Sequence, residues 1–292
     1  PDPGGPPHPS ALWGFMAALL RACLVVGYGS GGDAKAPAGW EEPFVEASNY
    51  AVFRALTGNK LFYQINDSLA AANITTISAF DSMSSVTTGA GLRASTNFGK
   101  RSSTVTTSDW FVIADQKTCL VSLSSQYGHI LHGFGEYFSL VNGISHNNFV
   151  LGHNNTSQCG STHGFGSCGA SNAGFVLTGH PLTTVDMSLP QQAWLVICGQ
   201  GLSQDTARYI NGNGFLGPDP AVQGYMAEAA WFGTGWNHVG RYLGKLRGAY
   251  MPQAYLPKSH GEIFSQEGKT FLALKLGSHS SGADNLGQAW ID

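Results

Sequence analysis

Charged side chains are scarce in this chain of 292 residues. They make up 11% of the sequence, well below the roughly 25% of an average soluble domain. The net charge is −3, and no basic run is longer than the pair Lys100-Arg101. We therefore expect neither a nucleic-acid partner nor a polybasic patch that binds a membrane. A surface with so little charge repels its neighbours weakly, which favours a protein held permanently in an assembly.

Long apolar runs and a disulfide pattern are also missing. The longest apolar run near the start, residues 17–26, contains Arg21 and has no basic region before it. It is too short to span a bilayer, so we expect neither a membrane helix nor a signal peptide. The cysteines are odd in number and match no disulfide framework, which predicts reduced thiols. They are Cys23, Cys119, Cys159, Cys168 and Cys198.

The N-terminal region combines a proline-rich arm with one predicted helix. Residues 1–9 hold five prolines and two glycines, so we expect residues 1–10 to form an extended arm. Ser10 is a suitable N-cap, and apolar residues recur at helical spacing over residues 11–23. Gly27 and Gly29 then follow as helix terminators. This pattern predicts an amphipathic helix packed on a β core.

Most of the remaining chain has the period-two pattern of strands. A turn at Thr57-Gly58-Asn59 separates the first two segments, and the connections at residues 114–117 and 124–128 predict antiparallel hairpins. Residues 143–174 are rich in Asn, Ser, Gly and His, and predict a long surface loop. The predicted strands are residues 40–55, 60–66, 75–80, 103–107, 110–114, 119–123, 129–134, 174–177, 193–198, 225–232, 241–251 and 269–276.

These elements predict a mainly β protein. We expect an antiparallel sandwich or barrel-like core with one N-terminal helix and long glycine-rich loops. Residues 11–292 would form a single β-rich domain, and a subdivision near residues 143–174 is the alternative. No repeat of 20 to 50 residues is visible, which argues against a solenoid or propeller.

Two motifs resemble catalytic signatures without their context. Gly27, Gly29 and Gly32 satisfy G-x-G-x-x-G, but a dinucleotide site needs a helix after the glycines, and Pro37 and Gly39 interrupt that stretch. Residues 277–282 have the composition of a nucleophile elbow but not its arrangement. We therefore expect no bound cofactor and no serine hydrolase.

A zinc site is a weaker hypothesis in the loop after residue 150. His153, Cys159, His163 and Cys168 are residue types that zinc prefers. Their spacing does not match the C-x₂₋₄-C or H-x₃₋₅-H pattern of structural zinc sites. A polar loop whose side chains bond its own turns explains the same residues.

Glycan cleavage or binding is a second hypothesis. Glycoside hydrolysis needs two carboxylates roughly 5 to 10 Å apart, and salt bridges or capping turns explain isolated acidic residues equally well. The candidates are Glu136, Asp186, Asp205 and Glu228. Several aromatic residues are suited to stacking on sugar rings, although such residues also form cores and interfaces. They are Trp40, Trp231, Trp236, Tyr225 and Tyr242.

Four segments together resemble an uncharacterised family of structural proteins encoded among the virion genes of tailed bacteriophages. With the stretches that join them, they cover about half the chain in the family's order. The segments are residues 11–29 with Gly39-Trp40, residues 49–54 with 59–68, residues 110–115 continuing to 132–139, and residues 240–252 with 268–274 and 287–292. The His/Cys/Asn-rich loop at residues 146–172 departs from the family.

The resemblance implies a non-enzymatic subunit of the tail, baseplate or neck. Such a subunit would pack against other virion proteins, as a homo-oligomer in a ring, and would be located in the virion after assembly in the bacterial cytoplasm. A host-surface protein that binds or cleaves glycans is the alternative. Aromatic and arginine side chains commonly anchor protein interfaces. The candidate anchors here are Trp13, Trp231, Trp236, Arg241 and Arg247.

Overall fold

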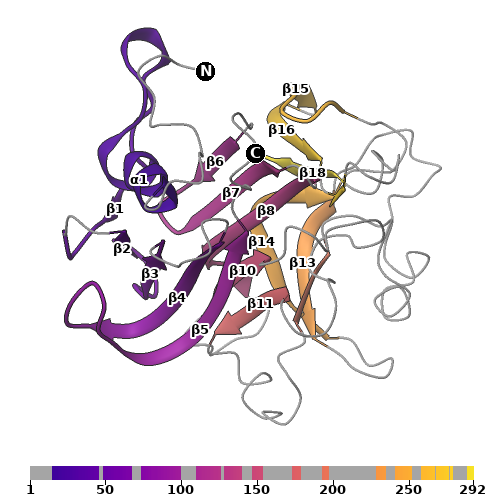
Figure 1. Ribbon diagram of the computed structural model, residues 1–292. Helices are drawn as coiled ribbons and strands as arrows, with labels where there is room; N and C mark the ends of the chain where they lie inside the picture. Colours follow the sequence, from indigo (N-terminus) through magenta and orange to yellow (C-terminus); the bar gives the residue numbers. More distant parts are fainter. Residues whose placement is uncertain are drawn as a thin grey trace.

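The computed structural model confirms a mainly β protein with antiparallel sheets and an N-terminal helix (Figure 1). The residues it describes are 15–45, 49–67, 74–99, 110–125, 128–139, 147–153, 173–178, 193–196, 228–234, 241–251, 258–266, 268–275, 277–278 and 288–292. The predicted arm at residues 1–10 and the predicted strand at 103–107 lie outside these ranges.

The predicted helix is present but ends in a different geometry. Helix α1 (Phe15–Arg21) continues into a π-helical segment, η1 (Ala22–Val26), which ends at Gly27 as expected. The Gly27 N–H donates to the Ala22 carbonyl, and its φ of 102° suits glycine. The turn after it contains the short 3-10 segment η2 (Gly31–Asp33), with no long helix to bind a dinucleotide.

The first sheet is a meander in the order β1-β2-β3-β4-β5. Its strands are β1 (Trp40–Glu41), β2 (Tyr50–Ala55), β3 (Phe62–Asn66), β4 (Ile74–Met83) and β5 (Gly89–Gly99). The prediction of one strand over residues 40–55 is wrong. Trp40 pairs with Ala55, so the chain reverses between them. The apolar pattern continues through both strands because both pack on the same core, and that pattern hides the reversal.

The second sheet has the order β11-β10-β8-β7-β6. Its strands are β6 (Trp110–Ala114), β7 (Thr118–Ser125), β8 (Gly128–Glu136), β10 (Asn148–His153) and β11 (Ala173–Thr178). The two predicted hairpins between residues 110 and 134 are confirmed. The predicted loop at residues 143–174 is wrong at both ends, because β10 pairs with both β8 and β11. That pairing is long-range, and the polar composition of residues 143–174 does not predict it.

The third sheet has the order β12-β13-β14-β18-β16-β15. Its strands are β12 (Ala193–Val196), β13 (Glu228–Thr234), β14 (Arg241–Met251), β15 (Ile263–Gln266), β16 (Lys269–Lys275) and β18 (Gln288–Ile291). Two short strands connect the second and third sheets. After β8 the chain enters β9 (Phe138–Ser139), which pairs with β14, and after β16 it enters β17 (Gly277–Ser278), which pairs with β8.

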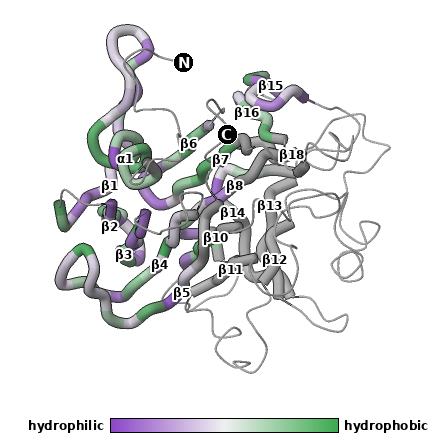
Figure 2. The backbone as a smooth tube through the Cα atoms, in the orientation of Figure 1, coloured by the Kyte–Doolittle hydropathy of each residue, from purple (hydrophilic) through white to green (hydrophobic). Residues whose placement is uncertain are grey.

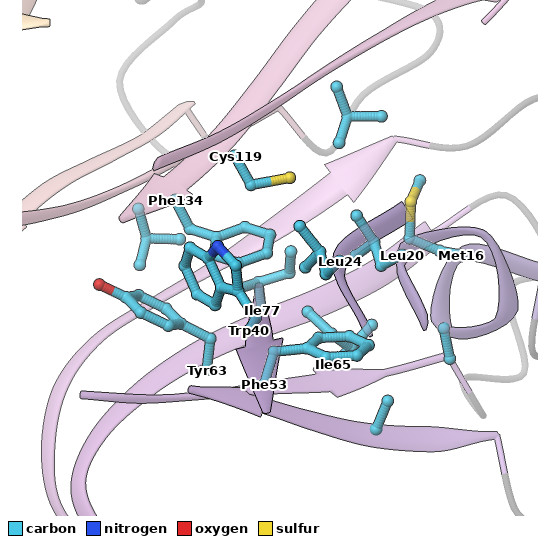
Figure 3. Close-up of a cluster of buried hydrophobic side chains, with 14 of the residues drawn as sticks. Met16, Leu20, Leu24, Trp40, Phe53, Tyr63, Ile65, Ile77, Cys119 and Phe134 are labelled. Carbon is cyan, nitrogen blue, oxygen red and sulfur yellow. The ribbon is translucent and has the colours of Figure 1, made fainter. Parts of the chain in front are cut away.

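The main core lies between the first two sheets and is closed by the helical segment. The rings of Trp40, Tyr63 and Phe134 meet at centroid distances of 5.0 to 5.8 Å, and Leu20 and Leu24 approach them from α1 and η1 (Figure 3). On one side β5 lies beside β10 and β11, and on the other η1 contacts both β1 and β6. Figure 2 shows apolar stretches on α1, β6 and β7, the elements that meet here.

Candidate functional site

A network of polar side chains lies where the three sheets meet, and three of its members, Tyr63, Glu136 and Asn148, are buried. We call it the sheet junction. It is built from the β2–β3 turn, the β6–β7 turn, the end of β8, the start of β10 and the middle of β14. Its residues are Asn59, Tyr63, Asp115, Lys117, Glu136, Asn147, Asn148 and Arg247.

Glu136 joins the second sheet to the first. Its side chain is buried, and its Oε1 accepts a hydrogen bond from the backbone N–H of Asn59. Its Oε2 lies 3.8 Å from the Lys117 ammonium group. A Cβ at position 58 would overlap the carboxylate, so the turn needs Gly58, whose φ is +75°. The carboxylate therefore caps a hairpin turn of the neighbouring sheet.

A chain of amides extends this contact into the core. The Asn59 side chain donates to the Oδ1 atoms of both Asn147 and Asn148. Asn148 in turn donates to the Tyr63 hydroxyl at 2.6 Å. Burial raises the pKa of Tyr63 well above its ordinary value, although the bond from Asn148 opposes this shift. The phenol is therefore neutral, and the network is fixed by neutral hydrogen bonds around one carboxylate.

Asp115 connects all three sheets from the β6–β7 turn. Its Oδ1 accepts the N–H groups of Lys117 and Thr118, each at 2.7 Å, in an Asx-type turn. Its carbonyl accepts the Trp40 indole N–H at 2.7 Å. Its Oδ2 lies 3.1 Å from Nε of Arg247 in β14. One turn residue thereby contacts the edge of the first sheet and the middle of the third.

Asp67 forms a second polar connection, away from the junction. It is fully buried at the end of β3, where Oδ2 accepts the Met16 N–H of helix α1 at 2.7 Å and Oδ1 accepts the Thr75 hydroxyl. The first N–H groups of a helix have no partner within the helix. Sequence reasoning did not identify Asp67 as a cap, because the helix it contacts lies 51 residues earlier. The predicted N-cap, Ser10, lies outside the described residues.

The carboxylate candidates for glycan cleavage are not brought together in the part of the chain that the structure describes. Glu136 is engaged in the sheet junction. Glu228 begins β13, where its backbone pairs with Met251. Asp186 and Asp205 lie outside the described residues. Of the aromatic candidates, Trp40 is a core residue, and Tyr225 is not described.

The zinc and interface candidates are described only in part. His153 ends β10 opposite Ala173, while Cys159, His163 and Cys168 lie outside the described residues. Within the described ranges, no group of three or more His, Cys, Asp or Glu side chains is placed to hold a metal ion. Trp13 and Trp236 lie outside those ranges too, whereas Trp231 in β13 and Arg241 in β14 are strand residues.

Arg247 is the interface candidate with described side-chain contacts. Besides the ion pair with Asp115, its guanidinium lies 4.4 Å from the centroid of the Phe138 ring in β9. The Phe138 ring remains 54% exposed. Arg247 therefore connects the third sheet to the second within the chain, beside an aromatic ring that still faces solvent.

The described helices include none that is long and apolar enough to cross a membrane. No protein-family model matches the chain, and no curated protein matches its sequence.

Proposed function

We propose that this chain is a non-enzymatic structural subunit of a tailed-phage virion, in the tail, baseplate or neck. It would pack against other virion proteins in a symmetric, ring-shaped homo-oligomer, and it would need no cofactor. The support from the sequence is the low charge and the order of the four family-like segments.

The sheet junction is the observation that carries the proposal. Its carboxylates and amides bond to backbone and side-chain groups of neighbouring sheets, and this fixes the sheets relative to one another. A catalytic carboxylate must instead approach a substrate. The use of Glu136 and Asp115 as connectors is what we expect of a protein that works through a fixed shape and its outer surfaces.

Large apolar side chains on the surface give further support. They are suited to contacts between proteins, although single exposed apolar residues are also common on monomers. Those between about half and three quarters exposed are Val26, Val45, Leu56, Leu92, Phe138 and Ile263.

The test is the mass of the purified protein by light scattering, together with negative-stain images of the same sample. We expect a closed ring, or a discrete complex when a neighbouring virion protein is co-expressed. A monomer at high concentration that also forms no complex with co-expressed virion proteins would contradict the proposal. Glycan-dependent stabilisation of that monomer would favour the host-surface alternative.

A further inference from the structure

Strand β15 is an uncharged edge of the third sheet. Within the described ranges it pairs only with β16. Its sequence, Ile-Phe-Ser-Gln, contains no charge and no proline. The Ile263 side chain is 72% exposed, and Ser265 on the same face is also exposed. An edge strand without charge or proline is a template for pairing with another strand.

The hydrogen bonds of β15 show which of its backbone groups face outward. The Ala273 N–H of β16 donates to the Glu262 carbonyl, so Glu262 faces β16. Residues that face a neighbouring strand alternate along an antiparallel pair. Phe264 and Gln266 therefore also face β16, and the N–H and C=O groups of Ile263 and Ser265 point away from the sheet.

Three other edge strands of the structure are protected. Strand β1 has only two residues, and Glu42 and Pro43 follow it. Strand β6 lies beside η1, and the ring centroids of Tyr28 and Trp110 are 5.4 Å apart. Strand β5 lies beside β10 and β11. These are common ways to prevent pairing at a sheet edge. Strand β15 is also short and is flanked by Glu262 and Glu267, but no described element other than β16 pairs with it.

We propose that β15 pairs with β15 of a second copy of this chain, antiparallel and centred on Phe264. In this register Ile263 lies opposite Ser265 of the second copy, and each of these residues has its N–H and C=O directed at the other. The pairing forms up to about four hydrogen bonds between the copies. The two Phe264 side chains lie opposite each other at the closer, non-hydrogen-bonded position, where aromatic pairs stabilise a sheet.

The composition of the strand favours a second copy as the occupant. The outward-facing N–H and C=O groups of β15 are arranged symmetrically about Phe264. Two antiparallel copies can therefore pair without an unpaired backbone group at the centre. Just outside β15, Glu262 would lie opposite the neutral Gln266 of the second copy, and no two like charges face each other. Phe264 is already held in place by Phe271, whose ring is stacked at 5.6 Å, so little side-chain ordering is needed on association.

This inference rests on the proposed function, because it assumes that the chain works in an assembly. The contact is two-fold and does not itself close a ring. It would join two subunits, or two rings face to face. Loss of the β15 contact is therefore distinguishable from loss of the ring.

The experiment compares the full-length protein with I263K and V45K by sedimentation velocity over a range of concentrations. Lysine at the edge brings two positive charges together across the two-fold axis and discourages pairing. We expect I263K to weaken association of the two copies about tenfold or more. V45K places a lysine at another exposed β-branched position outside β15, 77% exposed, and we expect it to leave the two-fold contact unchanged.

Ser265→Pro is the second test. Proline removes an N–H that faces the second copy, while the bonds of Phe264 and Gln266 to β16 remain. We expect the two-fold contact to be lost while the thermal unfolding midpoint changes little. A two-fold association of equal strength in the wild type, I263K and Ser265→Pro would overturn the β15 proposal, and a ring that still forms would leave the proposed function standing. A wild-type protein without any two-fold species, or an equal effect of V45K, would also overturn it.

Discussion

The sandwich formed by the first two sheets and the hairpin at the edge of the third sheet are stabilised in different ways. In the sandwich, large rings and aliphatic side chains are fully buried, and the polar groups among them bond across sheets. In the β15–β16 hairpin the described core is Phe271, Ala273 and the half-buried Phe264. The ion pair of β16 with the C-terminal residue, Lys269 to Asp292, is at the surface. Burial therefore dominates the first region, and strand pairing dominates the second.

The difference indicates which part of the molecule can bind another protein. Side chains in the sandwich make contacts within the chain. Among them are polar side chains that the sequence pattern offered as catalytic candidates. The hairpin keeps exposed apolar and backbone groups at its edge. Substitutions in the two regions should therefore differ in size and in kind.

The largest expected effect is in the sandwich core. Phe134→Ala removes a fully buried ring that contacts Trp40 and Tyr63, and we expect it to lower the free energy of unfolding by about 3–5 kcal/mol. Phe264→Ala, in the half-buried hairpin position, is the matched control and should cost clearly less. Urea denaturation of both variants measures the difference. Equal losses would show that the hairpin depends on burial as much as the sandwich does.

A smaller loss is expected when the buried cap of helix α1 is removed. Asp67→Ala leaves the Met16 N–H and the Thr75 hydroxyl without their acceptor, and we expect a cost of about 2–3 kcal/mol in the free energy of unfolding. Asp67→Asn retains an acceptor oxygen and should cost less. Chemical denaturation followed by circular dichroism measures both. An unchanged stability in Asp67→Ala would contradict the capping role.

The thiols in the core predict a pH dependence on the alkaline side. Burial raises the pKa of Cys23 to about 11 from an ordinary value of 9.0. The folded state then holds its proton at pH values where the unfolded chain has lost it. Stability is therefore complete below pH 9 and is lost as the pH rises towards 11.

We expect the step from pH 8 to pH 10 to cost about 1 kcal/mol through this thiol. Burial also raises the pKa of Cys119, which adds a loss of the same sign. The measurement is the urea midpoint at both pH values for the wild type and for Cys23→Ala. The difference between the two proteins isolates Cys23, and identical pH dependence would contradict its contribution.

The smallest effect is expected at the contact between the second and third sheets. Arg247 and Asp115 are partly exposed, so a double-mutant cycle with R247A and D115A should give a coupling of about 0–1 kcal/mol that falls as salt rises. The Lys258–Glu262 pair, within one short segment, is the control. A coupling well above this range, insensitive to salt, would mean that the ion pair is more buried in solution than its geometry indicates.

The class of the fold and most of the local elements follow from the amino-acid sequence alone. Strands β3, β6, β7, β8 and β14 and the turns at Gly58 and Asp115 follow from alternation and turn residues, which are properties of a few neighbouring positions. The helical spacing of Met16, Leu19 and Leu20 likewise predicted the face that is buried. The resemblance to phage structural proteins stays a prediction.

Which distant groups contact each other becomes visible only in the folded chain. Trp40 and Ala55 pair although the sequence pattern predicts one continuous strand across them, and β10 joins the second sheet from within a segment of loop-like composition. Asp67 and Glu136 each bond to a backbone N–H more than 50 residues away. A local sequence pattern does not show which distant groups a side chain will contact. A carboxylate that caps a distant turn and a carboxylate that performs catalysis are the same residue type in the sequence. The difference lies in what the folded chain places beside it.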